Sequence, residues 1–143
     1  MQFATVIKHF GHYGYVELEN LHALEQGNRA SLLQTVHRWA KRGLLIPLRR
    51  GFYALPAEYA KRPLEVEVAA NQLYHPSYTS GLWRMNQLGL IPEGVCEVQS
   101  ATLNNPATFE TPMGRYVYQH IGPNGYFGYE AEDTGGPVPV LAA

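Results

Sequence analysis

The chain contains a single cysteine, Cys96, so it cannot form a disulfide within itself. No apolar run approaches the roughly 18 residues of a membrane-spanning helix. The first residues also lack the apolar segment and the cleavage site of a signal peptide. These absences predict no disulfide framework and no membrane partner, and we expect a cytoplasmic location.

Sequence signatures of catalysis are missing as well. The chain has no glycine-rich phosphate loop, no zinc-protease helix and no serine-hydrolase elbow. His9 and His12 are three residues apart, but no cysteine or carboxylate cluster accompanies them, which favours a chance surface pair over a metal site. Cys96 falls in a predicted strand without a nearby base, where we expect a small buried hydrophobe. We therefore predict no enzyme, no cofactor and no metal.

Charge is scarce, at 16% of residues, and it is unevenly divided. Residues 1–63 hold nine of the eleven Lys and Arg against four Glu, a balance of +5. Residues 64–143 hold two Arg against seven Glu and one Asp, a balance of −6. With 45% hydrophobic residues, both halves are expected to fold. The asymmetry predicts that the first half binds a polyanion and that the second half has a different kind of partner.

In the first half, the hydrophobic spacing predicts three helices and a hairpin. The helices are expected at 4–10, at 19–25, and from Asn28, a plausible N-cap, to Gly43. The buried stripe of the third helix comprises Leu32, Leu33, Val36, Trp39 and Ala40. Residues 44–48 and 52–55 are the expected hairpin arms, with Arg49, Arg50 and Gly51 at the bend. A basic helix followed by a hairpin is the plan of a winged helix-turn-helix.

Residues 56–63 look like a linker, and the pattern then changes. Helices are expected at 66–73 and at 79–88, the second closed by Gly89 and Pro92. Strands are expected at 95–103, 115–121 and 126–130, with turns at 104–106, 122–125 and 134–137. The predicted fold class is α+β: an N-terminal winged helix-turn-helix over residues 1–60, followed by a small domain of helices and antiparallel strands over residues 61–143.

The third helix and the hairpin carry the predicted DNA-binding residues. A helix fits the major groove, where base edges can be read. The expected base-reading residues are Arg29, Ser31, Gln34, Thr35 and Arg38, and the expected phosphate contacts are Lys41, Arg42, Arg49 and Arg50. The alternative is a solvated helix face beside a hairpin with ordinary surface arginines.

The second half is rich in tyrosine. Several of the chain's ten tyrosines are either core residues of strands or contacts at a protein interface.

Several pieces of the chain together resemble the AbiEi family, antitoxins and transcriptional regulators of type IV toxin–antitoxin systems. The resemblance lies in WAKRGLLIPLRRGFYAL (39–55), SYTSGLWRMNQLGLIPE (77–93), VCEVQSATLNNPATFETPMGRYVYQHI (95–121) and FGYE (127–130). The order of the pieces is more specific than any one of them, because many winged helices carry a similar hairpin.

The resemblance implies a winged helix that represses its own operon by binding the promoter. It also implies an antitoxin-like domain at 61–143 that opposes a nucleotidyltransferase-like toxin. Members usually continue beyond the position of Leu141, so we expect this domain to be truncated at its C-terminus. The resemblance supplies no catalytic residues.

The sequence therefore predicts a sequence-specific DNA-binding repressor, the autoregulating antitoxin of such an operon. One alternative is a protein-interaction module that binds the toxin without binding DNA, and another is an enzyme that handles nucleotides through its second half. Many winged helices bind inverted repeats as homodimers, an arrangement open to this chain, although no heptad marks a dimer helix.

Overall fold

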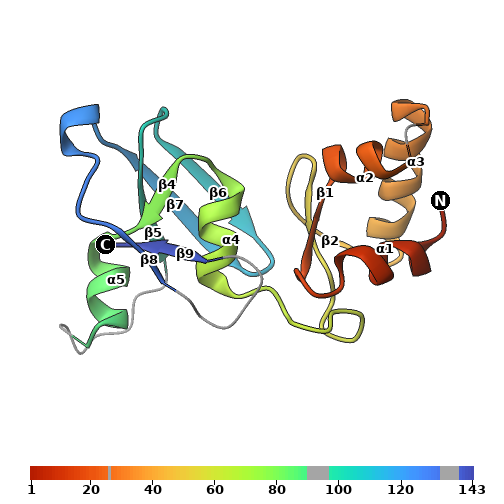
Figure 1. Cartoon of the computed structure of the whole chain (residues 1–143), viewed down its shortest axis with the longest axis horizontal. Helices are drawn as coiled ribbons and strands as arrows, with labels where there is room; N and C mark the ends of the chain where they lie inside the picture. The colour runs from red at the N-terminus through yellow and green to blue at the C-terminus, as the bar shows by residue number, and fades with distance from the viewer. Residues whose placement is uncertain (26, 90–96, 133–138) are drawn as a thin grey trace. The chain divides into compact units, whose positions relative to one another are not determined.

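The computed structural model describes residues 1–25, 27–89, 97–132 and 139–143 (Figure 1). These residues form five α-helices, one short 3-10 helix and nine strands in two sheets. The chain divides into two compact units, Met1–Leu64 and Glu65–Ala143. The fold is therefore mixed α+β, which confirms the predicted class at this level.

The first unit contains three helices and a three-stranded sheet. Its elements are α1 (Phe3–Phe10), β1 (Tyr15–Glu17), α2 (Leu18–Glu25), α3 (Arg29–Lys41), β2 (Ile46–Arg49) and β3 (Phe52–Ala54). The strands are antiparallel in the order β1-β3-β2. The predicted helices and hairpin are confirmed to within a few residues. The sequence prediction missed β1, because this three-residue strand is defined by its pairing with β3, about 37 residues later in the chain.

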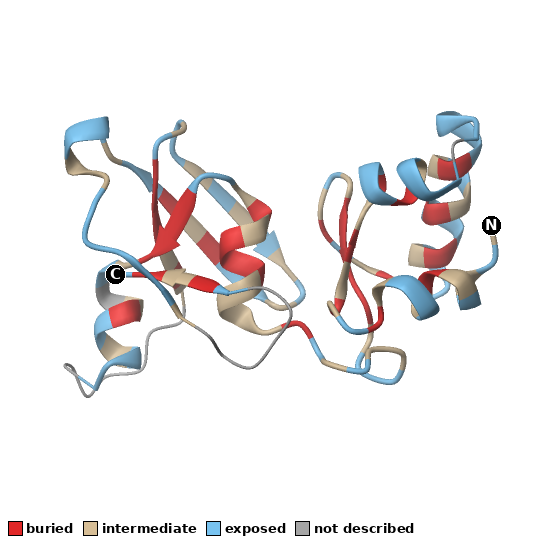
Figure 2. Cartoon of the chain, in the orientation of Figure 1, coloured by how far each residue is buried: buried red, intermediate tan, exposed pale blue. Residues whose placement is uncertain are grey.

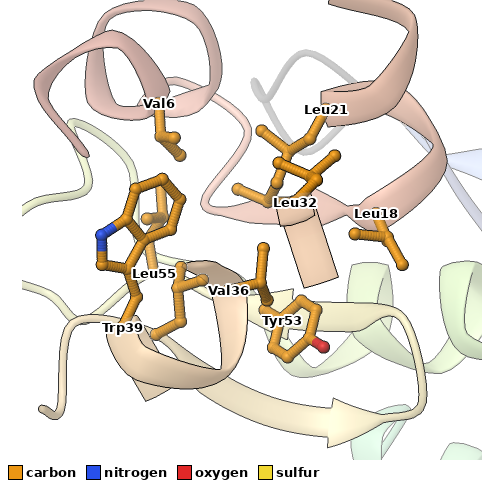
Figure 3. Close-up of a cluster of buried hydrophobic side chains, with 10 residues drawn as sticks. Val6, Leu18, Leu21, Leu32, Val36, Trp39, Tyr53 and Leu55 are labelled. Atoms are coloured by element: carbon orange, nitrogen blue, oxygen red, sulfur yellow. The ribbon is translucent and has the colours of Figure 1, made fainter. Parts of the chain in front are cut away.

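The core of the first unit joins all three helices to the sheet. Val6 of α1, Leu21 of α2, Val36 of α3 and Val16 of β1 are fully buried, and Tyr53 and Leu55 close the cluster from the β3 side (Figure 3). Trp39 is buried in the same cluster, with Phe3 edge-on to it at 5.4 Å. This packing fixes which side of α3 faces inward.

The segment expected to be a linker, residues 56–63, packs onto the first unit instead. The Lys61 amide donates to the Gly11 carbonyl at 3.0 Å, and Tyr59 lies edge-on to Phe3 at 5.3 Å. Gly14 has a φ of +80°, and a Cβ there would lie 2.6 Å from the Arg62 carbonyl oxygen. The close approach requires glycine at position 14. The linker prediction is wrong because its aromatic and backbone groups find partners in the preceding fold.

The second unit is built on one six-stranded sheet. Its elements are α4 (Val66–Leu73), β4 (Ser77–Thr79), α5 (Gly81–Gln87), β5 (Glu97–Thr102), β6 (Ala107–Thr111), β7 (Gly114–His120), the 3-10 helix η1 (Pro123–Gly125), β8 (Glu130–Glu132) and β9 (Val140–Ala142). The strand order is β6-β7-β5-β4-β9-β8. The pairs β5–β7 and β4–β9 are parallel, so the prediction of purely antiparallel strands is wrong.

Buried side chains join α4 to one face of this sheet. Tyr118 of β7 donates its hydroxyl to the Ala70 carbonyl. The buried amide of Asn71 both donates to the Leu141 carbonyl, at 3.1 Å, and accepts from the Leu141 amide, at 2.7 Å. This double hydrogen bond ties α4 to β9. Asn71 thus holds a three-residue strand that the sequence pattern does not reveal.

Two further boundaries differ from the prediction. Thr79 belongs to β4 and not to a helix, since it pairs with Ser100, and α5 begins only at Gly81. Residues 126–129 are not a strand: they follow η1, and β8 begins at Glu130. The predicted strand start at 95, the helix stop at Pro92, the turn at 134–137 and the environment of Cys96 lie outside the described residues. Within the described residues, no helix has the length and apolarity to cross a membrane.

Candidate nucleic-acid interface

The helix α3 presents a face without carboxylates to solvent. Its thirteen residues include no Asp or Glu, and bands of buried and exposed residues alternate along it (Figure 2). Leu32, Val36 and Trp39 are buried, and they lie on one side of the helix at spacings of three and four. Asn28 caps the first turn, accepting from the Ala30 amide through Oδ1 at 2.8 Å. The predicted cap is confirmed.

Away from the core, the exposed and partly exposed side chains of α3, and that of Arg42 just beyond its end, lie on a crest and two flanks. At about 100° per residue, the crest opposite the core holds Ala30, Gln34, His37, Arg38 and Lys41, all of them exposed. One side, the Ser31 flank, holds Ser31, Thr35 and Arg42. The other side, the Arg29 flank, holds Arg29 and Leu33. The predicted DNA-binding residues of α3 therefore lie on different sides of the helix.

A chain of hydrogen bonds connects the Ser31 flank to the crest. The Thr35 hydroxyl donates to the Ser31 carbonyl at 3.0 Å. The Thr35 hydroxyl oxygen in turn accepts a hydrogen bond from Nη2 of Arg38 at 3.3 Å. Thr35 is partly exposed, and its hydroxyl holds the guanidinium of Arg38 against the helix. Arg38 forms no ion pair with the residues that the structure describes.

The Arg29 flank borders a groove that also reaches α2 and the hairpin turn. The groove has a volume of about 260 Å³. Its lining consists of Glu17, Leu18, Glu19, Arg29, Leu33, Arg49, Arg50 and Gly51. Two of the lining residues are joined by a backbone hydrogen bond, in which the Leu18 amide donates to the Gly51 carbonyl at 2.9 Å. Three arginines and two glutamates thus meet in one place, which we call the arginine groove.

The side chains in the arginine groove are partly organised by neighbours. Arg29 forms an ion pair with Glu19 in which both side chains are more than half exposed. The Arg49 guanidinium lies 5.3 Å from the centre of the Phe52 ring and donates to the Arg50 carbonyl at 2.9 Å. The register of the hairpin shifts between Pro47 and Arg49, a bulge that changes the direction in which Arg49 leaves the strand. Gly51 completes the turn with a φ of +79°.

Two tyrosines near the hairpin remain neutral at physiological pH. Burial raises the pKa of Tyr15, and the charge of Glu17 and the nearby Tyr13 raise it further. Burial also raises the pKa of Tyr53, although a backbone hydrogen bond from Gly51 opposes the shift. The charge of this surface is therefore set by its arginines and glutamates.

The structure brings some predicted site residues together and separates others. Arg29, Arg49 and Arg50 share the arginine groove, whereas Ser31, Thr35 and Arg42 lie on the far flank of α3. Gln34, Arg38 and Lys41 occupy the crest between them. His37 and Glu19 were not among the site residues predicted from the sequence. His37 could have been found from its spacing of three from Gln34, whereas no local pattern shows that Glu19 meets Arg29.

The described residues contain no candidate metal site. No group of three or more His, Cys, Asp or Glu side chains among them could hold a metal ion. No protein-family model matches the chain, and a search of curated proteins finds no matching sequence.

Proposed function

We propose that the protein binds double-stranded DNA in a sequence-specific manner and acts as a transcriptional repressor. The observation that carries this proposal is the exposed crest of α3, which has no carboxylate and lies next to the Arg29 flank, where α3 borders the arginine-bearing hairpin turn. The order α1-β1-α2-α3-β2-β3 is consistent with a winged helix-turn-helix in which α3 is the recognition helix and β2–β3 the wing.

Gln34 and Arg38 are the proposed base-reading residues. Both are exposed on the crest, one helical turn apart. A glutamine amide can pair with the edge of adenine, and an arginine guanidinium with that of guanine. The hydrogen bond from Arg38 to Thr35 orients the guanidinium before it meets DNA, which lowers the entropic cost of the contact.

Phosphate contacts are assigned to four further cations, on α3, just after it and at the hairpin. Lys41 lies on the crest, Arg42 on the Ser31 flank, and Arg49 and Arg50 at the hairpin. The unit as a whole carries nine Lys and Arg against four Glu, so its field attracts a polyanion. The second unit is acidic and is not expected to contribute phosphate contacts.

The biological setting of the proposal comes from the resemblance to the AbiEi family. On that basis, the repressed promoter is that of the protein's own toxin–antitoxin operon, in the cytoplasm. Repression is steric, since a protein seated on the promoter excludes the polymerase.

Binding to a duplex selected from a random library, compared with a scrambled duplex, tests the proposal. With about six phosphates engaged, the logarithm of affinity should fall with the logarithm of salt concentration at a slope of about −5. Arg38→Ala should weaken the binding free energy by about 1–3 kcal/mol for the selected duplex and by little for the scrambled one.

Lys8→Ala is the matched control, because Lys8 is an exposed cation of α1, outside α3 and the hairpin. Lys8→Ala should lower the affinity for both duplexes slightly and equally. If Arg38→Ala leaves the preference for the selected duplex unchanged, α3 does not read bases through Arg38. If the wild-type chain selects no duplex, the proposed function is wrong.

A second function is favoured by one observation in the second unit. Phe127 is 71% exposed, and it lies beside an aromatic cluster of Tyr78, Tyr126 and Tyr129 whose ring centres are 4.9–5.1 Å apart. Exposed aromatic residues are common in protein interfaces. A module that binds a protein, such as a nucleotidyltransferase-like toxin, without binding DNA would use this surface. Phe127→Ala should then abolish partner binding and leave DNA binding unaffected.

A further inference from the structure

The arginine groove holds more opposing charge than a simple phosphate site would. Arg29, Arg49 and Arg50 line it together with Glu17 and Glu19. A phosphate group entering the groove meets three guanidinium groups, but it also meets two carboxylates. The arrangement raises the question of what the carboxylates do when DNA is bound.

Glu19 is the carboxylate that acts directly on a cation of the groove. Its Oε1 pairs with Nη1 of Arg29, and the two side chains are 64% and 54% exposed. An ion pair so open to water contributes little to stability. A phosphate can therefore replace Glu19 as the partner of Arg29 at small cost to the fold.

The other two arginines line the same groove as Arg29. Arg49 is oriented by the Phe52 ring and by the Arg50 carbonyl, and Arg50 is exposed at the turn. These residues come from the hairpin, whereas Arg29 comes from α3, so a ligand that engages all three must enter the groove between the two elements. A phosphodiester of a DNA strand has the charge and the acceptor geometry for this contact.

We propose that the arginine groove binds one DNA backbone phosphate and that Glu19 is an internal competitor for it. In the free protein, Glu19 holds Arg29; on binding, the phosphate displaces it. Glu19 thus lowers the affinity for every DNA sequence equally. This inference rests on the proposed function, and it changes the role of Arg29 from reading bases to binding the backbone.

The variant Glu19→Gln removes the competing charge and keeps the shape of the side chain. We expect it to bind the selected and the scrambled duplex with equally increased affinity, about 2–5-fold at low salt, the equivalent of an exposed ion pair. The gain should shrink as salt rises, because the competition is electrostatic.

Glu25→Gln is the matched control. Glu25 lies on the same helix, also pairs with a cation, the N-terminal amine of Met1 at 3.2 Å, and does not line the arginine groove. It changes the net charge identically, so it reports the general electrostatic effect alone. Equal gains for Glu19→Gln and Glu25→Gln would overturn the proposal, as would no gain for Glu19→Gln.

A double-mutant cycle shows whether the gain acts through Arg29. Adding Glu19→Gln to the Arg29→Ala variant should produce no increase in affinity beyond that of the control. A full gain in the Arg29→Ala background would also contradict the proposal. All these positions are exposed, so the variants should fold, which circular dichroism can check.

Titration with inorganic phosphate separates this inference from the proposed function. If the wild-type chain binds neither duplex, the DNA-binding function fails, but the groove can still be examined by the NMR signals of its arginine side chains. At constant ionic strength, phosphate should shift the Nε–Hε signal of Arg29 at lower concentration in Glu19→Gln than in the wild type. Identical titrations in the two proteins would overturn Glu19 as a competitor, and no shift of the Arg29 signal in either protein would falsify the groove as a phosphate site.

Discussion

Tyr116 and Tyr118 lie two residues apart on β7, and both side chains are buried on the same face of the sheet. The hydroxyl of Tyr118 donates to the Ala70 carbonyl. The hydroxyl of Tyr116 has no hydrogen-bond partner among the described residues. A buried polar group without a partner costs free energy that its paired neighbour does not.

The two tyrosines should therefore respond differently to loss of the hydroxyl. We expect Tyr116→Phe to leave the free energy of unfolding unchanged, or to raise it by up to about 1 kcal/mol. Tyr118→Phe should lower it by about 1 kcal/mol, because the hydrogen bond to the Ala70 carbonyl is lost. Urea unfolding of the two variants measures both values. An equal loss in both would mean that Tyr116 has a partner in solution, such as a bound water.

Tyr116 should also make the free energy of unfolding depend on pH in the alkaline range. Burial, with a smaller contribution from Glu67, raises the pKa of Tyr116 to about 12. A raised pKa in the folded state favours the protonated form, so this contribution to stability is present below pH 10 and declines as the pH rises from about 10 to about 12. Over that range, the stability of wild type should fall more steeply than that of Tyr116→Phe.

At the scale of elements, α3 depends on its N-cap. The Asn28 side chain satisfies the Ala30 amide, which has no acceptor within the helix. Asn28→Ala should lower the free energy of unfolding by about 1 kcal/mol, whereas Asn28→Ser should retain most of the stability because serine also accepts this bond. Urea unfolding of the two variants checks the difference. Equal stabilities would mean that tertiary packing alone sets the start of α3.

The elements also differ in how far the sequence predicts them. The helices α1, α2, α3 and α4 follow from apolar spacings of three and four, since their periodicity extends over two or more turns. The strands β1, β8 and β9 are three residues long, too short for alternation to be recognised. The strands β1 and β9 also depend on partners far away in the chain, as Leu141 depends on Asn71.

At the scale of the whole molecule, the two units carry opposite charge. Met1–Leu64 has a balance of +5 and Glu65–Ala143 a balance of −6. A polyanion should therefore engage the first unit alone. In hydrogen exchange at low salt, a random-sequence duplex should protect backbone amides at the start of α2, in α3 and around Gly51, and should leave those of β5–β7 unchanged. Protection concentrated in β5–β7 would contradict this division of roles.

By itself, the sequence determines the helices of the first unit, the cap of α3 and the cationic character of residues 1–63. These features depend on composition or on residues three or four apart, where local backbone geometry decides the outcome. Only the tertiary structure decides that Arg29 faces Glu19 and the hairpin while Ser31 and Arg42 lie on the other flank of α3. That partition depends on where the hairpin packs, through contacts such as Leu18 with Gly51, and no local pattern encodes a contact between residues so far apart.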